Sequence, residues 1–214
     1  MPEDEVKRAY HSPVRAERAA QTRRRVRAAA EALFLRAGYA ATSMKQVAAE
    51  AGVAERTLYL NFPTKAALLN EIIRVSVRGH DRDEPLAAGA GFRAVLEAPP
   101  DEIVGEMARM SAALMGRSAR VLAIGEAAAI VDPALREFRD RGHAATRADV
   151  REVADALARR GALAPHLTPA RAADALFAIV ANESLYLRLV DECGWTDAEY
   201  ARLLEGLLAH LVRP

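Results

Sequence analysis

The 214-residue sequence predicts an all-α protein of about nine helices. Hydrophobic residues make up 51% of the chain and aromatic residues 5%, and alanine and leucine dominate with few β-branched runs, which favours helices. Apolar residues also recur every three to four positions, which is the spacing of one helix face. Helix-start signals are spread along the chain, as at Asp132-Pro133 and Thr168-Pro169, where a capping side chain precedes a proline.

The first expected helix ends at Gly38. Its apolar positions form one stripe of an amphipathic helix, namely Val26, Ala29, Ala30, Leu33, Phe34 and Ala37. Its other face and N-terminal end are rich in arginine, which could neutralise a phosphate backbone or could simply be solvated, at Arg15, Arg18, Arg23, Arg24, Arg25 and Arg27. We expect residues 1–14 to form a disordered arm before this helix.

The next segment reads as a helix-turn-helix. Ser43 and Gln46 form a capping box at the start of one short helix, and Gly52 follows it where a left-handed residue lets the chain reverse. A second short helix runs from Glu55 to about Leu60, and Pro63 ends it. A helix of this length with a polar tip suits the major groove of DNA.

Several short motifs of this region, in order, resemble the N-terminal domain of TetR-family transcriptional regulators. They are Gly38-Tyr39, Thr42-Ser43, Val47-Ala48, Ala51-Gly52-Val53, Thr57-Leu58-Tyr59, Phe62-Pro63 and Lys65 with Leu68-Leu69. The resemblance implies a three-helix DNA-binding domain, which we place at residues 1–65, followed by a ligand-binding and dimerisation bundle at residues 66–214. Charge agrees with this division, because residues 1–65 hold 12 Lys and Arg against 7 Asp and Glu, whereas the remainder holds 18 against 22.

The resemblance also suggests roles for individual residues. Thr57, Tyr59 and Lys65 match family positions that contact the DNA backbone or bases. Position alone points to Ser43 and Lys45 near a phosphate and to Glu55 and Arg56 as base readers. The full set of expected DNA-binding residues is Ser43, Lys45, Glu55, Arg56, Thr57, Tyr59, Asn61 and Lys65.

Three departures from the family pattern lie in or beside the second short helix. Ala54 replaces the usual capping serine or threonine, which removes that cap at a cost of about 1 kcal/mol. Arg56-Thr57 and Leu60-Asn61 replace a frequent glycine-threonine pair and a frequent aromatic or histidine pair. The operator sequence therefore cannot be read from these residues.

After Lys65 the expected helices are longer. One ends at Arg78-Gly79, and a loop with at most one short helix follows to Pro100. We then expect helices to Met115, with a break at Gly116, and from Ser118 to Val131. Further helices are expected from Pro133 to Arg160 with a possible break at Gly142, from Pro169 to about Val190, and to Val212 after the capping box of Thr196 and Glu199.

The last two helices carry more apolar surface than one neighbour can cover. The surplus fits either burial inside the chain's own bundle or packing on a second copy, and in TetR-like proteins the last two helices commonly form a four-helix bundle with their twofold mates. We therefore expect a homodimer. Its interface is assigned to Leu176, Ile179, Val180, Leu203, Leu207 and Leu211.

The sequence shows no pattern typical of an enzyme, and we predict that the protein is not one. No metal-ligand spacing of histidines, phosphate loop or dinucleotide fingerprint occurs, and the single cysteine, Cys193, allows no intramolecular disulfide. No cofactor is expected. Met107, Met110 and Leu114 could line a ligand cavity, although ordinary core packing also fits them.

These observations predict a ligand-responsive transcriptional regulator, most simply a repressor. Its partners would be a palindromic double-stranded operator, a second copy of itself and a small-molecule effector of unknown identity that releases the DNA. We expect a cytoplasmic protein without a membrane association, since no apolar run reaches about 20 residues and the N-terminus is charged. The alternatives are a DNA-binding architectural or partner-recruiting protein without an effector and, with less support, a helical enzyme or carrier.

Overall fold

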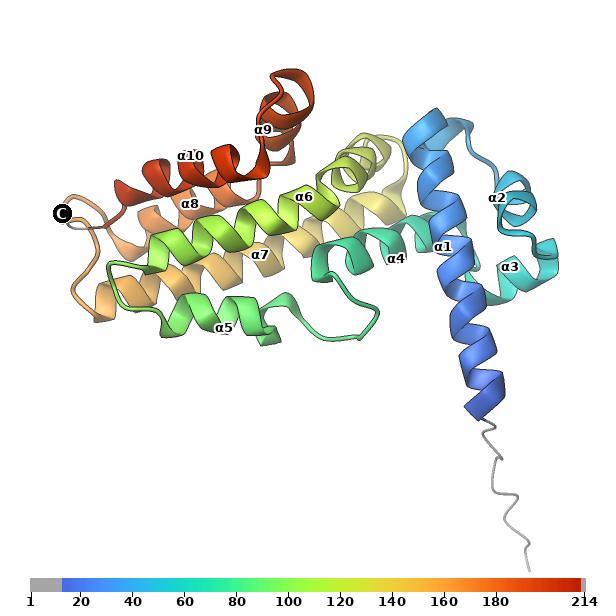
Figure 1. The fold of residues 1–214 in the computed structure, drawn as a ribbon, viewed down its shortest axis with the longest axis horizontal. Coiled ribbons are helices and arrows are strands. Elements are labelled where there is room, and N and C mark those ends of the chain that lie inside the picture. Colours follow the sequence, from blue (N-terminus) through green and yellow to red (C-terminus); the bar gives the residue numbers. More distant parts are fainter. Residues whose placement is uncertain (1–12, 213–214) are drawn as a thin grey trace, which may run out of the picture. The chain divides into compact units, whose positions relative to one another are not determined.

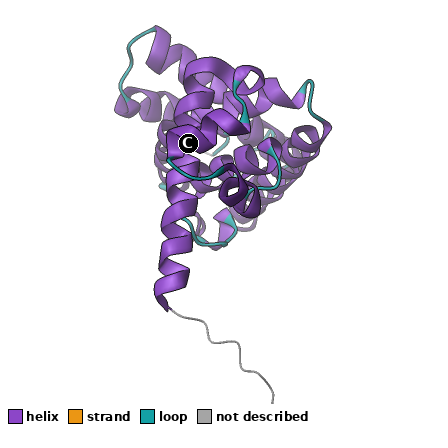
Figure 2. Ribbon diagram, turned by 90° about the vertical axis from the view of Figure 1, so that its right-hand side faces the viewer, coloured by secondary structure: helices purple, strands orange, loops and turns teal. Residues whose placement is uncertain are grey.

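The computed structural model describes residues 13–212 and confirms the all-α fold class. Figure 2 shows helices joined by loops in every described part of the chain, and one isolated antiparallel bridge pairs Leu163 with Val212. The predicted arm at residues 1–14 lies almost wholly outside the described residues. Contacts divide the chain between Leu68 and Leu69 into two compact units. This division and the boundary expected at Lys65 both fall in the first turn of one helix, α4.

The N-terminal unit contains α1 (Pro13–Ala41), α2 (Met44–Ala51), α3 (Glu55–Asn61) and the start of α4 (Lys65–Arg78). Helix α1 is interrupted at Gly38, whose φ of 81° is left-handed, so the expected helix end at this glycine is confirmed. Buried apolar side chains of this unit come from all of these helices and include Val26, Ala30, Phe34, Val47, Ala48, Leu58, Phe62 and Leu68.

The second unit continues α4 and adds η1 (Leu86–Ala88), α5 (Ala90–Glu97), α6 (Ile103–Ala129) and α7 (Pro133–Arg159). It closes with α8 (Pro169–Val180), α9 (Glu183–Leu187), a π-helical turn η2 (Arg188–Glu192) and α10 (Asp197–Ala209). Helix α6 is its central element and packs against α5, α7, α9 and α10, while α7 pairs with α8 (Figure 1). The expected caps at Asp132, Thr168 and Thr196 are present.

Two expected helix breaks are wrong, because α6 is continuous through Gly116 and α7 is continuous through Gly142. A Cβ at Gly116 would lie 3.3 Å from Asp197 Oδ2 and 3.5 Å from the hydroxyl of Tyr186. The glycine therefore serves close packing of α6 against the C-terminal segments. The hydroxyl of Ser118 donates to Leu114 O within the same helix and opens no new one.

The helix expected from Pro169 to Val190 is also wrong, because it ends at Val180. Ala181 has a non-helical backbone, and the side chain of Asn182 accepts a hydrogen bond from Leu185 N at 2.9 Å to start α9. The hydroxyl of buried Ser111 on α6 donates to the terminal carbonyl of Val180 at 2.8 Å, which compensates the break.

Candidate nucleic-acid interface

The turn between α2 and α3 is built from local sequence. Ser43 and Gln46 form the predicted capping box, and Gly52 ends α2 with a left-handed φ of 61°. Val53 N then donates to Ala48 O at 3.0 Å, which closes the turn. Ala54 precedes α3 without any side-chain cap, as its methyl group requires. The two helices are eight and seven residues long, too short to be stable alone.

Most of the residues assigned to DNA contact are exposed. Lys45, Glu55, Arg56 and Tyr59 have exposed side chains, with Tyr59 at 47%. Ser43 is exposed too, but its hydroxyl accepts from Gln46 N at 3.2 Å and donates to Gln46 Oε1 at 2.8 Å, so it serves the cap. Thr57, Asn61 and Lys65 are half-buried. Among the assigned residues, Glu55, Arg56 and Tyr59 therefore lie on the outward surface of α3.

Lys65 braces the end of α1. Its Nζ donates to Tyr39 O at 2.8 Å and to Thr42 O at 2.9 Å, and it lies 4.2 Å from the centroid of the Tyr39 ring. These contacts hold the first turn of α4 against the segment that joins α1 to α2. The expected phosphate contact of Lys65 is untested, but this ammonium group already has a structural role.

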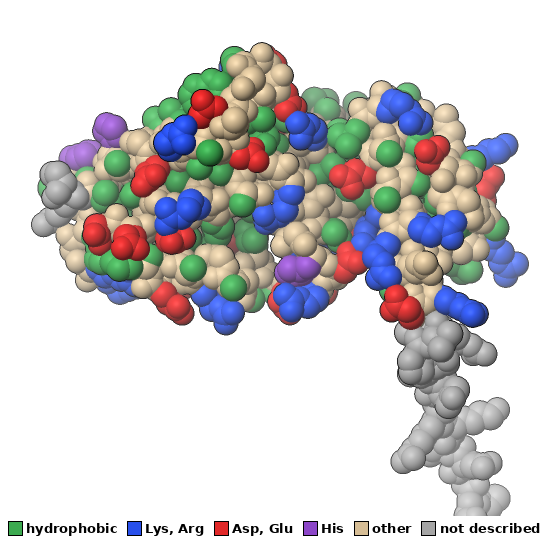
Figure 3. All heavy atoms as spheres, in the orientation of Figure 1, with side chains coloured by type: hydrophobic (Ala, Val, Ile, Leu, Met, Phe, Trp, Pro, Cys, Tyr) green, Lys and Arg blue, Asp and Glu red, His purple; other side chains and the backbone are tan. Residues whose placement is uncertain are grey.

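Two arginines of α1 have similar roles. Arg25 Nη2 donates to Ala51 O at 2.6 Å and to Gly52 O at 3.2 Å, at the end of α2. Arg23 Nη1 donates to Asn61 O at 3.1 Å, at the end of α3, and its guanidinium lies 4.5 Å from the centroid of the Phe62 ring. These two side chains, which the sequence suggested for phosphate neutralisation, connect α1 to the helix-turn-helix. Lys and Arg side chains nonetheless occupy several places on the visible face of this unit (Figure 3).

Burial also changes one acidic group of α1. Glu31 is half-buried, and desolvation raises the pKa of its carboxyl while the nearby charge of Arg27 lowers it. The carboxyl of Glu31 is therefore protonated more readily than that of an exposed glutamate.

Leu60 was not identified from the sequence. Its side chain is 79% exposed on α3, next to Tyr59, whereas Leu58 on the opposite side is fully buried. The signal was present in the helical spacing, because a residue two positions after a buried one lies on the other side of a helix.

The second unit has an outward apolar face on α10. Tyr200, Leu204 and Leu208 point into the core with no exposed surface, whereas Leu207 is 40% exposed and Leu203 is half-buried. On α8, Ile179 is half-buried as well. Three other residues assigned to the interface are buried within their own unit and retain at most 7% exposed surface, namely Leu176, Val180 and Leu211. The interface itself stays a prediction.

The residues assigned to a ligand cavity belong to the core of the second unit. Met107 is 2% exposed, and Met110 and Leu114 are partly buried against the same cluster. The hydroxyl of Tyr200 is fully buried there and has no hydrogen-bond partner among the described residues. Burial raises the pKa of this phenol to about 12. A buried polar group without a partner is unusual and identifies a point where a ligand could bind.

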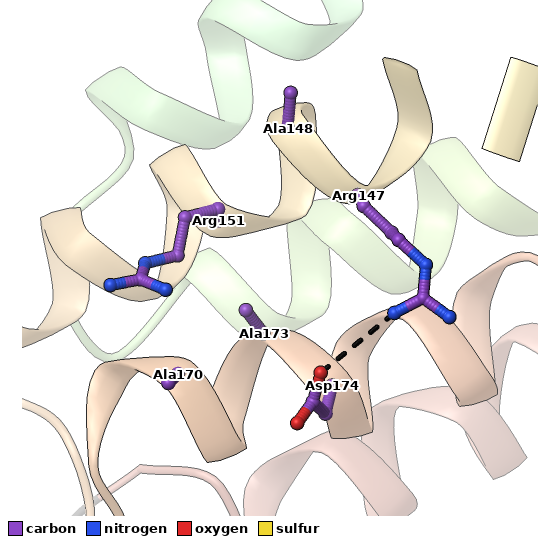
Figure 4. Close-up of a pocket in the computed structure, with 6 residues that line it drawn as sticks. All are labelled: Arg147, Ala148, Arg151, Ala170, Ala173 and Asp174. Carbon is purple, nitrogen blue, oxygen red and sulfur yellow. Dashed lines mark ion pairs between the residues drawn. The ribbon is translucent and has the colours of Figure 1, made fainter. Parts of the chain in front are cut away.

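A separate groove of about 330 Å³ lies on the surface between α7 and α8 (Figure 4). Three of its lining residues are alanines, and Arg147 reaches across toward Asp174 with 3.8 Å between the charged atoms. None of the three residues assigned to a ligand cavity lines it.

Within residues 13–212, every helix is too short or too polar to span a membrane. No group of three or more His, Cys, Asp or Glu side chains in that range could hold a metal ion.

The family model described as bacterial regulatory proteins, tetR family, matches residues 26–72. No curated protein matches the sequence. Among solved structures, NalD, the secondary repressor of the MexAB-OprM multidrug efflux pump in Pseudomonas aeruginosa, is 28% identical with a TM-score of 0.70, and the match covers 92% of this chain and 98% of NalD.

Two more distant structures show the same fold. The complex of SmeT with triclosan is 21% identical with a TM-score of 0.69, and the match covers 90% of this chain and 92% of SmeT. The complex of AibR with isovaleryl coenzyme A and operator DNA is 21% identical with a TM-score of 0.65, and the match covers 89% of this chain and 99% of AibR.

Proposed function

The chain belongs to the TetR family of bacterial regulatory proteins, and from this premise we propose that it is a repressor that binds a palindromic operator as a homodimer and releases it when a small molecule binds. The observation that carries the proposal is the helix-turn-helix of the N-terminal unit. Its second helix presents Glu55, Arg56 and Tyr59 outward, and these side chains suit base edges and phosphates. NalD is described as a repressor, which supports repression and not activation as the function of this chain.

The homodimer rests on the outward face of α10. Leu203 and Leu207 are four residues apart and lie on one side of the helix, away from the buried side that carries Tyr200 and Leu204. Partly exposed leucines at this spacing favour packing on a second copy of the same face. A twofold dimer would place two copies of α3 on two half-sites about one helical turn apart.

The effector site is proposed for the core between α6 and α10. Met107, Met110 and Leu114 supply adaptable apolar surface, and the hydroxyl of Tyr200 supplies one polar group that lacks a partner. SmeT and AibR were each solved with a small molecule, which supports an effector for this chain but not its identity. We infer that the effector is mainly apolar and carries at least one hydrogen-bonding group.

The test begins with DNA fragments from the genome that encodes the protein. Fragments retained by the purified protein should share a motif with twofold symmetry, and random retention would contradict specific binding. Compounds that raise the melting temperature of the protein are then titrated with and without this DNA. A compound that lowers operator affinity must bind less tightly in the presence of operator, by the same factor. Equal binding in both cases would favour the architectural alternative without an effector.

A further inference from the structure

The second half of α3 offers little polar surface for reading DNA. Asn61 is half-buried, and its Nδ2 donates to Thr57 O at 2.8 Å, so its amide is turned back onto its own helix. Its backbone carbonyl accepts from Arg23. Lys65, the next cation along the chain, donates to Tyr39 O and Thr42 O. The outward side chains that remain in this half of the helix are Tyr59 and Leu60.

Leu60 is the most exposed large hydrophobic residue among the described residues, at 79%. It lies four residues after Arg56, so the two side chains share one face of α3 one turn apart. Arg56 is also exposed, and an arginine in this position suits the acceptors of guanine. The same face therefore joins a cation that can read a base edge to an apolar side chain beside it.

The major groove has one apolar feature on its base edges, the 5-methyl group of thymine. The N-terminal segment that carries α3 is basic, which suits it to the surface of DNA. We propose that Leu60 is a specificity-determining residue that contacts the 5-methyl group of one thymine in each half-site. The proposal rests on the proposed function, because α3 must enter the major groove for Leu60 to meet a base.

The test uses the full-length protein and a duplex selected by it from random DNA. Each thymine of the duplex is replaced in turn by deoxyuridine, which lacks the methyl group and keeps the base pairing. We expect affinity to fall about four-fold for the contacted thymine, as for the exposure of one methylene-sized group, and to be nearly unchanged at the others.

The variant Leu60→Ala should bind the thymine duplex less tightly than the parent protein, by at least about four-fold per half-site. Its affinity should no longer change when the thymine is replaced by deoxyuridine. Alanine has the higher helix propensity, so α3 is expected to remain folded, which circular dichroism checks. Leu35→Ala is the matched control, because Leu35 is a 46% exposed leucine of α1 in the same unit. It should keep both the affinity and the deoxyuridine response of the parent protein.

The proposal is overturned if Leu60→Ala responds to deoxyuridine as the parent does, or if no thymine of the selected duplex is sensitive. It is also overturned if Leu60→Ala leaves DNA binding unchanged, which would assign the leucine to a protein partner. A parent protein that selects no duplex at all would instead refute the proposed function. A parent that selects DNA without any methyl response would refute only the role of Leu60.

Discussion

Replacing Lys65 by methionine separates a structural role from a DNA contact. The change removes two hydrogen bonds from a charged donor, to Tyr39 O and Thr42 O, and the contact with the Tyr39 ring. Each such hydrogen bond contributes about 1.5–3 kcal/mol, and the half-buried site favours the lower end. The cation–π contact adds about 0.5 kcal/mol. We expect a total loss of about 3.5 kcal/mol in the free energy of unfolding of the N-terminal unit.

Lys45 is the matched control, because it is an exposed lysine of the same unit with no hydrogen bond or ion pair described. Lys45→Met should leave the stability nearly unchanged. If Lys45 contacts a phosphate, its loss should flatten the dependence of log affinity on log salt by about 0.9 per half-site. Lys65→Met should instead keep the parent's salt dependence, when measured at a temperature where the variant is folded.

Two assays distinguish the variants. Thermal unfolding followed by circular dichroism should show a fall of about 10 °C or more for the N-terminal unit of Lys65→Met, and hydrogen exchange should locate the loss in α1 to α3. DNA binding at four salt concentrations gives the slopes. A Lys65→Met protein as stable as the parent, with a flatter salt dependence, would refute the structural role and restore the phosphate contact predicted from the sequence.

Three other predictions concern the second unit. Leu207→Glu should sediment as a monomer at micromolar concentration, because the dimer would bury an unpaired charge at its interface. The control Ile130→Glu should remain dimeric, because position 130 is already 72% exposed. A parent protein that sediments as a monomer would contradict the dimer itself. Tyr186→Phe should lose about 1 kcal/mol of stability in urea unfolding, because the Tyr186 hydroxyl donates to Asp197 Oδ1 at 2.6 Å. Tyr200→Phe should lose none, because the Tyr200 hydroxyl has no partner among the described residues. Equal losses in the two variants would refute this difference. Desolvation raises the pKa of each of these tyrosines to about 12, so between pH 10 and pH 12 the unfolded chain loses protons that the native state keeps. Stability should therefore fall as the pH rises through that window, and it should fall less in Tyr200→Phe. A parent protein whose urea midpoint does not change between pH 10 and pH 12 would contradict the raised pKa values.

Local signals predicted most of the fold. The caps at Ser43, Asp132, Thr168 and Thr196 are correct because a cap depends on residues within one helical turn. The errors arose where a distant segment decided the outcome. Gly116 looks like a helix breaker in sequence, but Asp197 and Tyr186 pack against it, and a pattern along one helix cannot show that approach.

The candidate DNA surface was predictable in outline and less so residue by residue. The order of the motifs located the helix-turn-helix, and Glu55, Arg56 and Tyr59 are exposed as expected. The exposure of Leu60 could have been inferred from its helical spacing to Leu58, but the inward hydrogen bonds of Lys65 depend on tertiary packing. The split of the interface leucines has the same origin, because helical spacing alone does not say which of two apolar faces on α10 meets the chain's own core.

The three cations that turn inward share one physical role. Lys65 donates to carbonyls after the Gly38 break in α1, Arg25 to carbonyls at the end of α2, and Arg23 to the last carbonyl of α3. The final carbonyls of a helix lack partners within it and carry partial negative charge, so a cation there satisfies them and favours the helix dipole. Such support matters for α2 and α3, which are too short to persist alone. We therefore expect fewer contacts with phosphate than the number of lysines and arginines in this unit. The salt dependence of operator binding should be correspondingly shallower than that number implies.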